Sequence, residues 1–480
     1  AAAPHRVRYD ADGRPAAPPP SGSPSRSDGT SRQNVVLICL DTVRADALAP
    51  WAKGAPAMPE TSAWLRTATV FRDAHAPAPW TAPSVTSLLT GLLPSNHGVR
   101  ELSDATELAA AIPTLAEILT AAGVRCAAFT GGGWVRASNG SLQGFPVVGE
   151  RFSFAGGGDL LVRNHRNMPP GAANFLFLHT YEAHDPYGAP GARMAAPPPP
   201  PTTHLDAAAL AAIDAEAGVD GGRALALRFL TDPTTRADVF ESIPGRRRLD
   251  LAMRWLDRGW RDDPRGVETV AAARRAYDLG LVRLDRALAA YLRGVDEIPA
   301  LHDAVIVLCS DHGEGFAEHG SNHHGRRVYA ELTHVPLAIR APGLPRGAVI
   351  DGTCSLLDVM PTILELEGLL PPEGGDGTSL LPLVRGDAHG ARLAVSEERR
   401  STAAFGENDA ELVAVRDDRV TWIGARDRRG VHEEAYDRVA DPGEARPIPV
   451  GEALARAGDT LRRAVEARRP VSYTHLTLPT

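Results

Sequence analysis

Two continuous apolar runs of strand length constrain the fold of this chain most strongly. Residues 34–40 read Asn-Val-Val-Leu-Ile-Cys-Leu, and residues 304–309 read Ala-Val-Ile-Val-Leu-Cys. Runs that are rich in β-branched residues and lack alternation are typical of strands buried on both faces of a parallel sheet. Further strands are expected at 124–129, 175–178 and 335–340, and helices at 112–123, 271–294, 356–368 and 454–469. The order predicts an α/β fold with a central, mostly parallel sheet flanked by helices.

Composition predicts how the chain is divided. Residues 1–33 are rich in Pro, Ala, Ser and Gly, which predicts a disordered arm or linker. A catalytic domain is expected over 34–390, with a helical insertion at 205–270. Short strand patterns separated by turns predict a small C-terminal antiparallel α+β subdomain over 391–470. Residues 471–480 break the composition abruptly and resemble translated sequencing-adapter sequence, so we leave them out of the fold.

Charge and cysteine usage exclude some classes of function. The 480 residues carry a net charge of -8, and the 51 basic and 59 acidic residues are spread along the chain. The basic patch that nucleic-acid binding needs is missing, so we expect no nucleic-acid partner. The four cysteines show no paired spacing of a zinc or redox site. Cys39 and Cys309 lie within the two apolar runs and are expected to be buried free thiols.

The sequence does not determine the cellular compartment of the protein. No apolar run is long enough to span a bilayer. The chain begins at Ala1 without Met, and a processed or truncated N-terminus could have lost a signal peptide. A periplasmic, extracellular or cytoplasmic location is therefore possible, and the oligomeric state is unreadable.

Metal-ligating side chains follow both apolar runs. Asp41 comes directly after the first run, and Asp311 and His312 follow the second. Carboxyl ends of parallel strands meet at one edge of a sheet, where α/β proteins place their sites. Carboxylate and imidazole ligands suit Ca²⁺, Mn²⁺, Zn²⁺ or Mg²⁺. We therefore predict a divalent metal site. The alternatives are a turn or N-cap role for Asp41 and an ordinary surface pair of Asp311 and His312.

A candidate nucleophile lies in the segment 78–91. Pro79 and Pro83 exclude helix before Thr81, and Gly91 has the position of a C-cap. The pattern predicts a short helix with the Thr81 hydroxyl at its N-terminus. Unpaired N–H groups make this a site where an anionic ester would dock. The alternative is an N-cap Thr without chemistry.

Histidines near two of the strand ends are candidate acid–base groups. His179 and His184 follow the strand at 175–178, and His324 follows the Asp311 segment. Each could be an ordinary loop or packing histidine, but the polar density after a buried strand favours a site. His184 and His324 could hold an anion or protonate a leaving group. A second metal would need ligands such as His184 or Asp185 with His324.

In this order, the segments resemble the sulfatase branch of the alkaline-phosphatase superfamily over about residues 34–445. Residues 34–46 resemble its opening strand with the first metal aspartate, 81–91 its nucleophile segment, and 310–314 its second metal strand. Further similarities lie at 94–98, 175–187, 358–362, 376–380 and 435–444. The resemblance implies an alkaline-phosphatase-like fold, one or possibly two divalent metal ions, and an anionic ester as substrate.

Two departures from the family pattern concern the nucleophile. Related sulfatases usually carry Cys or Ser, converted to formylglycine, where Thr81 stands, and Arg where Val85 stands. Threonine cannot give that aldehyde because its β-carbon bears a methyl group. Phosphoester-cleaving relatives are similar in using Thr directly. We therefore predict a metal-dependent hydrolase that cleaves phosphate, sulfate or phosphonate esters through a covalent Thr81 intermediate, with phosphoester chemistry favoured.

Three other functions remain compatible with the sequence. A sulfuric ester hydrolase would fit the family as a whole. A phosphotransferase acting on envelope glycans or lipids would use the same nucleophile with an acceptor alcohol in place of water. A binding module with a degenerate site would explain the altered nucleophile and Arg positions, but it would not explain why Asp41, Thr81, Asp311 and His312 are all present.

Overall fold

A computed structural model describes residues 32–100, 107–167, 173–184, 264–320, 323–387, 392–400, 410–427 and 430–468. Most of the predicted arm, most of the predicted insertion and the whole terminal tail lie outside these ranges. The domain boundaries drawn from composition stay predictions.

The centre of the structure is an eight-stranded sheet with the order β4-β3-β5-β1-β6-β7-β2-β8. Its strands are β1 (Val35–Leu40), β2 (Thr69–His75), β3 (Arg125–Phe129), β4 (Val147–Gly149), β5 (Asn174–Thr180), β6 (Val305–Ser310), β7 (Leu337–Arg340) and β8 (Val349–Ser355). Among these strands, β7 alone runs antiparallel to its neighbours. The prediction of a central, mostly parallel sheet is confirmed.

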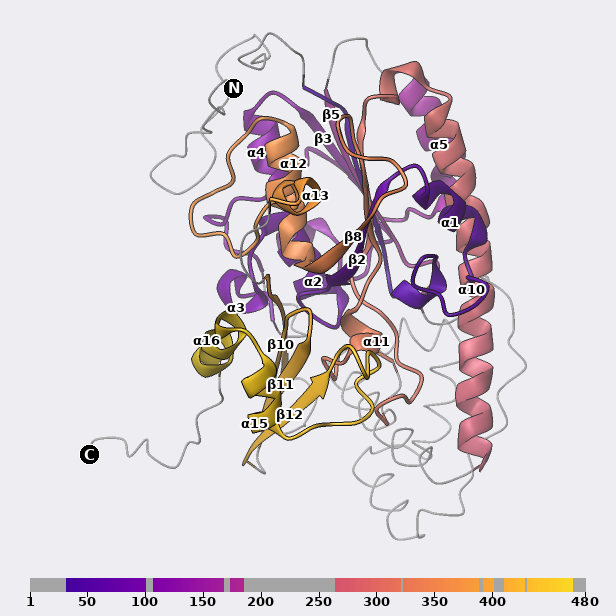
Figure 1. Ribbon diagram of the computed structural model, residues 1–480. Coiled ribbons are helices and arrows are strands. Elements are labelled where there is room, and N and C mark those ends of the chain that lie inside the picture. The colour runs from indigo at the N-terminus through magenta and orange to yellow at the C-terminus, as the bar shows by residue number, and fades with distance from the viewer. Residues whose placement is uncertain are drawn as a thin grey trace, which may run out of the picture.

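Helices cover both faces of this sheet (Figure 1). One face carries α2 (Thr81–Thr90), α4 (Leu115–Ala121), α12 (Val359–Leu366) and α13 (Leu381–Arg385), and the other carries α1 (Pro59–Leu65), α5 (Phe154–Arg166) and α10 (Pro264–Asp296). Successive residues of β1 point to opposite faces. Leu37 therefore joins the core of Leu88, whereas Ile38 joins the core of Leu284. This double burial explains the uninterrupted apolar run of β1.

The remaining elements of the described chain outside the C-terminal region are short. They are the helices α3 (Pro94–His97) and α11 (Ala330–Thr333) and the 3-10 turns η1 (Ala45–Ala47), η2 (Ala137–Asn139), η3 (Pro299–Leu301) and η4 (Leu356–Asp358).

A second, four-stranded antiparallel sheet has the order β12-β11-β10-β9. It comprises β9 (Ala394–Arg400), β10 (Ala410–Arg416), β11 (Val420–Asp427) and β12 (Gly430–Asp437), with α15 (Val450–Arg456) and α16 (Asp459–Arg468) packed on it. Trp422 is fully buried under these helices. The prediction of a small C-terminal antiparallel sheet is confirmed.

Buried ion pairs connect this small sheet to the rest of the protein. The Arg438 guanidinium contacts both carboxylate oxygens of Asp73 on β2, with Nη1 2.9 Å from Oδ2. Arg416 Nε lies 3.1 Å from Glu444 Oε1, and its Nη2 donates to the carbonyl of Val328. The two sheets are therefore held together by directed polar contacts as well as by apolar packing.

Several elements differ from the sequence expectations. The single helix expected at 454–469 is wrong, because α15 and α16 are separated at Ala457 and Gly458. The helix expected from residue 112 begins only after Thr114, which forms a capping box with Glu117. The strand expected at 175–178 continues to Thr180, so His179 lies inside the sheet.

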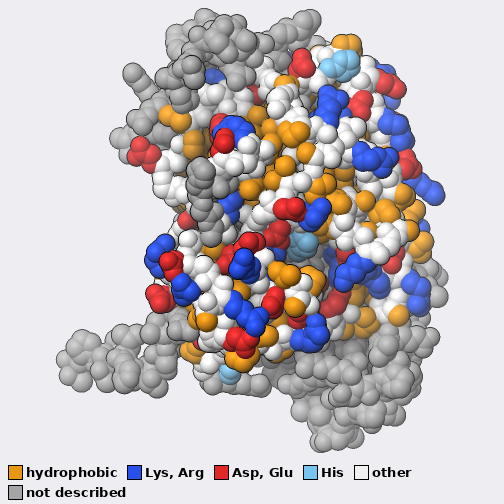
Figure 2. Space-filling view, in the orientation of Figure 1, with side chains coloured by type: hydrophobic (Ala, Val, Ile, Leu, Met, Phe, Trp, Pro, Cys, Tyr) orange, Lys and Arg blue, Asp and Glu red, His pale blue; other side chains and the backbone are white. Residues whose placement is uncertain are grey.

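Surface properties agree with the composition. On the face in Figure 2, acidic and basic side chains are interspersed over the described part of the chain. All four cysteines are buried and free, which confirms the prediction made for Cys39 and Cys309. Of the helices in the described ranges, none has the length and apolar character that crossing a bilayer requires.

Candidate active site and metal centre

Three parallel strands end together at one edge of the central sheet. Leu40 of β1 is in register with Thr180 of β5 and Ser310 of β6. The Ser310 hydroxyl lies 2.6 Å from the Leu40 carbonyl oxygen and accepts the Val43 N–H at 2.9 Å. These bonds hold the ends of β1 and β6 against each other, so the residues that follow them leave the sheet side by side.

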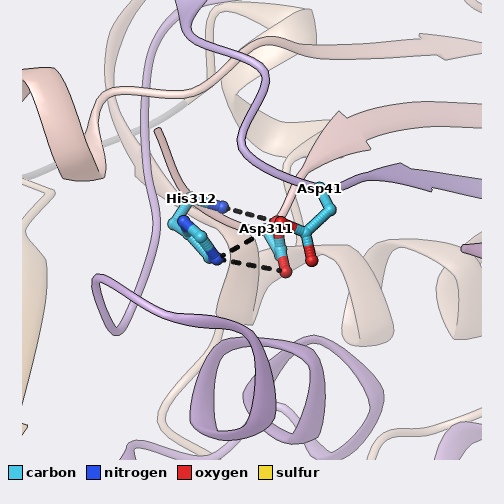
Figure 3. Close-up of side chains that lie close together, drawn as sticks. All are labelled: Asp41, Asp311 and His312. Atoms are coloured by element: carbon cyan, nitrogen blue, oxygen red, sulfur yellow. Dashed lines mark hydrogen bonds and ion pairs between the residues drawn. The ribbon is translucent and has the colours of Figure 1, made fainter. Parts of the chain in front are cut away.

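The three predicted metal ligands converge at this edge. Asp41, Asp311 and His312 are fully buried and point toward one another, with one ligand atom from each within 4.8 Å of the others (Figure 3). His312 Nε2 lies 3.6 Å from Asp311 Oδ2 and 3.7 Å from Asp41 Oδ1. The structure therefore brings together residues that are 270 positions apart in the sequence.

The donor atoms of this group fit a divalent cation. Within the described residues, Asp41 Oδ1 and Asp311 Oδ2 are buried without a hydrogen-bond donor. His312 Nδ1 lies 2.9 Å from the Gly313 carbonyl oxygen, so Nδ1 carries the proton and the Nε2 lone pair faces the carboxylates. Buried carboxylate oxygens without donors are costly unless a cation neutralises them.

Thr81 lies directly beside this group. Its Oγ1 is 3.1 Å from Asp41 Oδ2 and 3.2 Å from His312 Nε2. Trp80 is the N-cap of α2, and Thr81 is the first residue within the helix. The alternative that Thr81 serves only as an N-cap is therefore wrong. Gly91 ends the helix in the left-handed conformation, with φ 67°, as predicted.

The two predicted catalytic histidines also lie at this site. His184 Nε2 is 4.0 Å from Asp41 Oδ1, and the His184 and His324 rings are 4.9 Å apart. The ring of His324 is 4.5 Å from that of His312, and its Nδ1 is 3.1 Å from Glu314 Oε1. Asp185, the other residue considered for a second metal, lies outside the described residues.

Burial and the surrounding charges shift several pKa values at the site. Burial raises the pKa of Asp41, but His184, His179 and His312 outweigh burial, so the pKa is lowered. Burial lowers the pKa of His179, but Asp311 and Asp41 raise it to about 9. Asp41 is therefore ionised at neutral pH.

A charged carboxylate also stands next to the His324 ring. Burial raises the pKa of Glu314, but the charge and hydrogen bond of His324 lower it to about 2. An ionised Glu314 holds the proton on His324 Nδ1 and fixes the tautomer of that ring.

The sequence analysis did not assign Tyr181 to the site. Its hydroxyl accepts the Trp134 N–H at 3.0 Å and also interacts with the Thr81 side chain. A Cβ atom on Gly131 would lie 2.4 Å from the Tyr181 ring, and one on Gly133 would lie 2.9 Å from its hydroxyl. The glycine run at 131–133 thus makes room for Tyr181, and this run was the signal that could have indicated such a contact.

Two further histidines, His319 and His334, have structural contacts. His319 Nδ1 lies 2.8 Å from Glu331 Oε1, its Nε2 lies 2.8 Å from the Glu444 carbonyl oxygen, and its ring stacks on Tyr329. His334 Nε2 lies 2.9 Å from the Arg72 carbonyl oxygen. These contacts connect the loop after β6 and the α11 segment to neighbouring parts of the structure.

Comparison with known proteins agrees with this geometry. A sequence model described as Sulfatase matches residues 33–369. This chain belongs to the sulfatase family. The matched range contains Asp41, Thr81, Asp311 and His312. The family predicted from the sequence is therefore confirmed.

Individual relatives of this sulfatase-family chain are distant. A delta 4,5-hexuronate-2-O-sulfatase of Bacteroides thetaiotaomicron is 25% identical over 79% of this chain and 76% of its own length. An arylsulfatase of Clostridium perfringens is 26% identical over 40% of this chain and only 39% of its own length. The match thus spans well under two thirds of the clostridial enzyme.

A solved structure shares the fold. The phosphonate monoester hydrolase of Silicibacter pomeroyi superposes with a TM-score of 0.64 at 22% identity, covering 91% of this chain and 95% of that one. The expected alkaline-phosphatase-like architecture of the sulfatase family is thereby confirmed.

Proposed function

We propose that this sulfatase-family protein hydrolyses phosphate or phosphonate esters with Thr81 as a covalent nucleophile. The observation that carries the proposal is the position of the Thr81 hydroxyl, 3.1 Å from Asp41 Oδ2 and 3.2 Å from His312 Nε2. A buried hydroxyl at a helix N-terminus, beside a candidate metal centre, is where nucleophile and anionic substrate would meet.

Asp41, Asp311 and His312 would hold a divalent cation. Such a cation would lower the pKa of the Thr81 hydroxyl and neutralise charge on the ester oxygens. The residues offer both oxygen and nitrogen donors, so the choice among Ca²⁺, Mn²⁺, Zn²⁺ and Mg²⁺ is part of the proposal to be tested.

The reaction would proceed through attack by Thr81 and hydrolysis of the resulting phosphothreonine, assisted by the neighbouring groups. Thr81 Oγ1 bonds to phosphorus, the bond from phosphorus to the leaving oxygen breaks, and the hydroxyl proton is released to solvent. His184 or His324 protonates the leaving alcohol. The N-terminal N–H groups of α2 stabilise the equatorial oxygens. Water then cleaves the phosphothreonine, and the hydroxyl of Thr81 is regained.

Sulfate ester hydrolysis is the second candidate. The relatives named above as sulfatases favour it, one of them over most of its own length. Threonine disfavours it, because a sulfated Thr81 lacks the aldehyde hydrate by which formylglycine enzymes release sulfate. A transferase would differ only in the acceptor that cleaves the intermediate.

The test compares purified protein loaded with Mn²⁺, Zn²⁺, Mg²⁺ or Ca²⁺ on aryl phosphate mono- and diesters, phosphonate monoesters and aryl sulfate. Thr81→Ala should abolish turnover, whereas Thr90→Ala, at the other end of α2, should retain it. Quenched reactions should show one phosphoryl group on the peptide that contains Thr81. Full activity of Thr81→Ala would overturn the nucleophile, and dominant sulfatase activity would favour the second candidate.

A further inference from the structure

His179 is a polar residue in the middle of the central sheet, and within the described structure its buried ring lacks the hydrogen bonds expected there. It lies in β5, in register with Cys39 of β1, and its side chain is fully buried. Among the described residues, neither of its ring nitrogens has a hydrogen-bond partner. Buried polar side chains almost always have such partners, so an unpaired imidazole in a central strand requires a reason.

The Nε2 atom of His179 faces both metal carboxylates. It lies 3.4 Å from Asp41 Oδ2 and 3.7 Å from Asp311 Oδ2. Both distances are too long for good hydrogen bonds. Two atoms that bind one zinc ion at about 2.1 Å stand about 3 to 4 Å apart, so these are the separations of ligands that share a cation.

The same separations occur for His312, which we already assign to the metal. His312 Nε2 lies 3.6 Å from Asp311 Oδ2 and 3.7 Å from Asp41 Oδ1. His179 and His312 therefore lie at similar distances from the two carboxylates, one from β5 and one from the end of β6, although they face different oxygens of Asp41. The three residues whose ligand atoms all lie within 4.8 Å of one another are Asp41, Asp311 and His312, so His179 would be an additional ligand that approaches this group from β5.

We propose that His179 is a further ligand of the metal, which makes the protein donor set two imidazoles, two carboxylates and the Thr81 oxygen. This inference rests on the metal centre of the proposed function. Two imidazole nitrogens favour a transition ion such as Zn²⁺ or Mn²⁺. Ca²⁺ takes six to eight oxygen ligands, which this group does not offer.

The alternative role for His179 is a donor that only orients Asp41. That role requires the Nε2-protonated tautomer, which is normally fixed by a donor that bonds to Nδ1 or by a short hydrogen bond from Nε2–H to an acceptor. The structure has neither, since both nitrogens lack partners within the described residues. Without a cation, Asp311 and Asp41 raise the pKa of His179, whereas a divalent cation held by the same carboxylates would repel a proton on this ring.

X-ray absorption at the zinc edge counts coordinated imidazoles and so tests the assignment without an activity assay. Metal-stripped full-length protein is loaded with one equivalent of Zn²⁺. The wild type should show two coordinated imidazoles, and His179→Gln should show one. His432→Gln, at an exposed position of β12, is the matched control and should show two. Circular dichroism checks that each variant is folded.

Competition with a chromophoric chelator gives the affinities. His179→Gln should weaken Zn²⁺ binding at least 100-fold and leave weak Ca²⁺ binding unchanged. One imidazole in the wild type, or two in His179→Gln, would overturn the inference while leaving the proposed function intact. A folded wild type that binds no metal would overturn both. If replacement of the buried His179 unfolds the protein, a count of one imidazole in the wild type still overturns the inference.

Discussion

The hydroxyl of Ser84 donates a 2.6 Å hydrogen bond to the backbone carbonyl of Asp311. This bond connects the first turn of α2, which begins with Thr81, to the end of β6, which carries two of the predicted metal ligands. Ser84 is fully buried, so no water competes for the contact. The position of Thr81, the proposed nucleophile, relative to Asp311, a proposed metal ligand, is therefore stabilised by a bond from a neighbouring side chain to the Asp311 backbone.

Replacing Ser84 by Ala should separate these two parts of the site. We expect a loss of about 1–2 kcal/mol in the free energy of unfolding. We also expect kcat to fall about tenfold or more with little change in KM, since small misplacements of reacting groups are costly. The control is Ser87→Ala, whose hydroxyl bonds to His97. A similar stability loss but near-normal kcat is expected there, and equal kcat values for both variants would contradict the role of Ser84.

Removal of the metal should destabilise the fold. Without a cation, Asp41 Oδ1 and Asp311 Oδ2 remain buried without donors in the described part of the chain. A cation at 100 times its dissociation constant would contribute about 2.7 kcal/mol. Scanning calorimetry with and without chelator should show a lowered Tm that returns when metal is added. Asp311→Asn should lose this response, whereas Asp303→Asn, at an exposed position, should keep it.

His319 should make stability depend on pH. Burial lowers its pKa, but Glu331 and the Glu444 carbonyl raise it to about 9, above the ordinary value of 6.5. The imidazolium therefore stabilises the fold fully below pH 6.5, and this contribution is lost as the pH rises through about 9. His319→Gln should cost on the order of 1–2 kcal/mol at pH 6 and progressively less toward pH 9. Urea titrations at each pH check this, and a pH-independent difference would contradict it.

The pair between Arg438 and Asp73 should be important for attachment of the small sheet. Both side chains are largely buried, and Arg438 also contacts His75 Nε2 at 2.9 Å. Removing one partner leaves a buried charge, so Arg438→Gln should lower the free energy of unfolding by about 2–4 kcal/mol. Arg456→Gln, which breaks the more exposed pair with Asp437, should change it very little, because solvent screens that pair. Equal effects in urea denaturation would refute this difference.

The sequence predicts best those strands that are buried on both faces of the sheet, because such strands are uninterrupted apolar runs. The uninterrupted apolar runs of β1 and β6 indicate central strands, and Asp41 and Asp311 follow them directly. Strands farther from the centre of the sheet lack this signal. β2 contains Arg72 and Asp73 within its seven residues, and the sequence analysis did not predict it. Its strand character depends on pairing with β7 and β8, which no local pattern reveals.

The sequence by itself determined which residue types were available for chemistry and where two of the strands end. Thr81 after Pro79, and Asp311 next to His312, follow from the order of the residues and the backbone limits of proline and glycine. Only the tertiary structure decided that Tyr181 packs on the glycine run at 131–133 and that His179 faces the carboxylates. The reason is that parallel strands are joined by long connections, so which side chains meet depends on strand order and register rather than on separation along the chain.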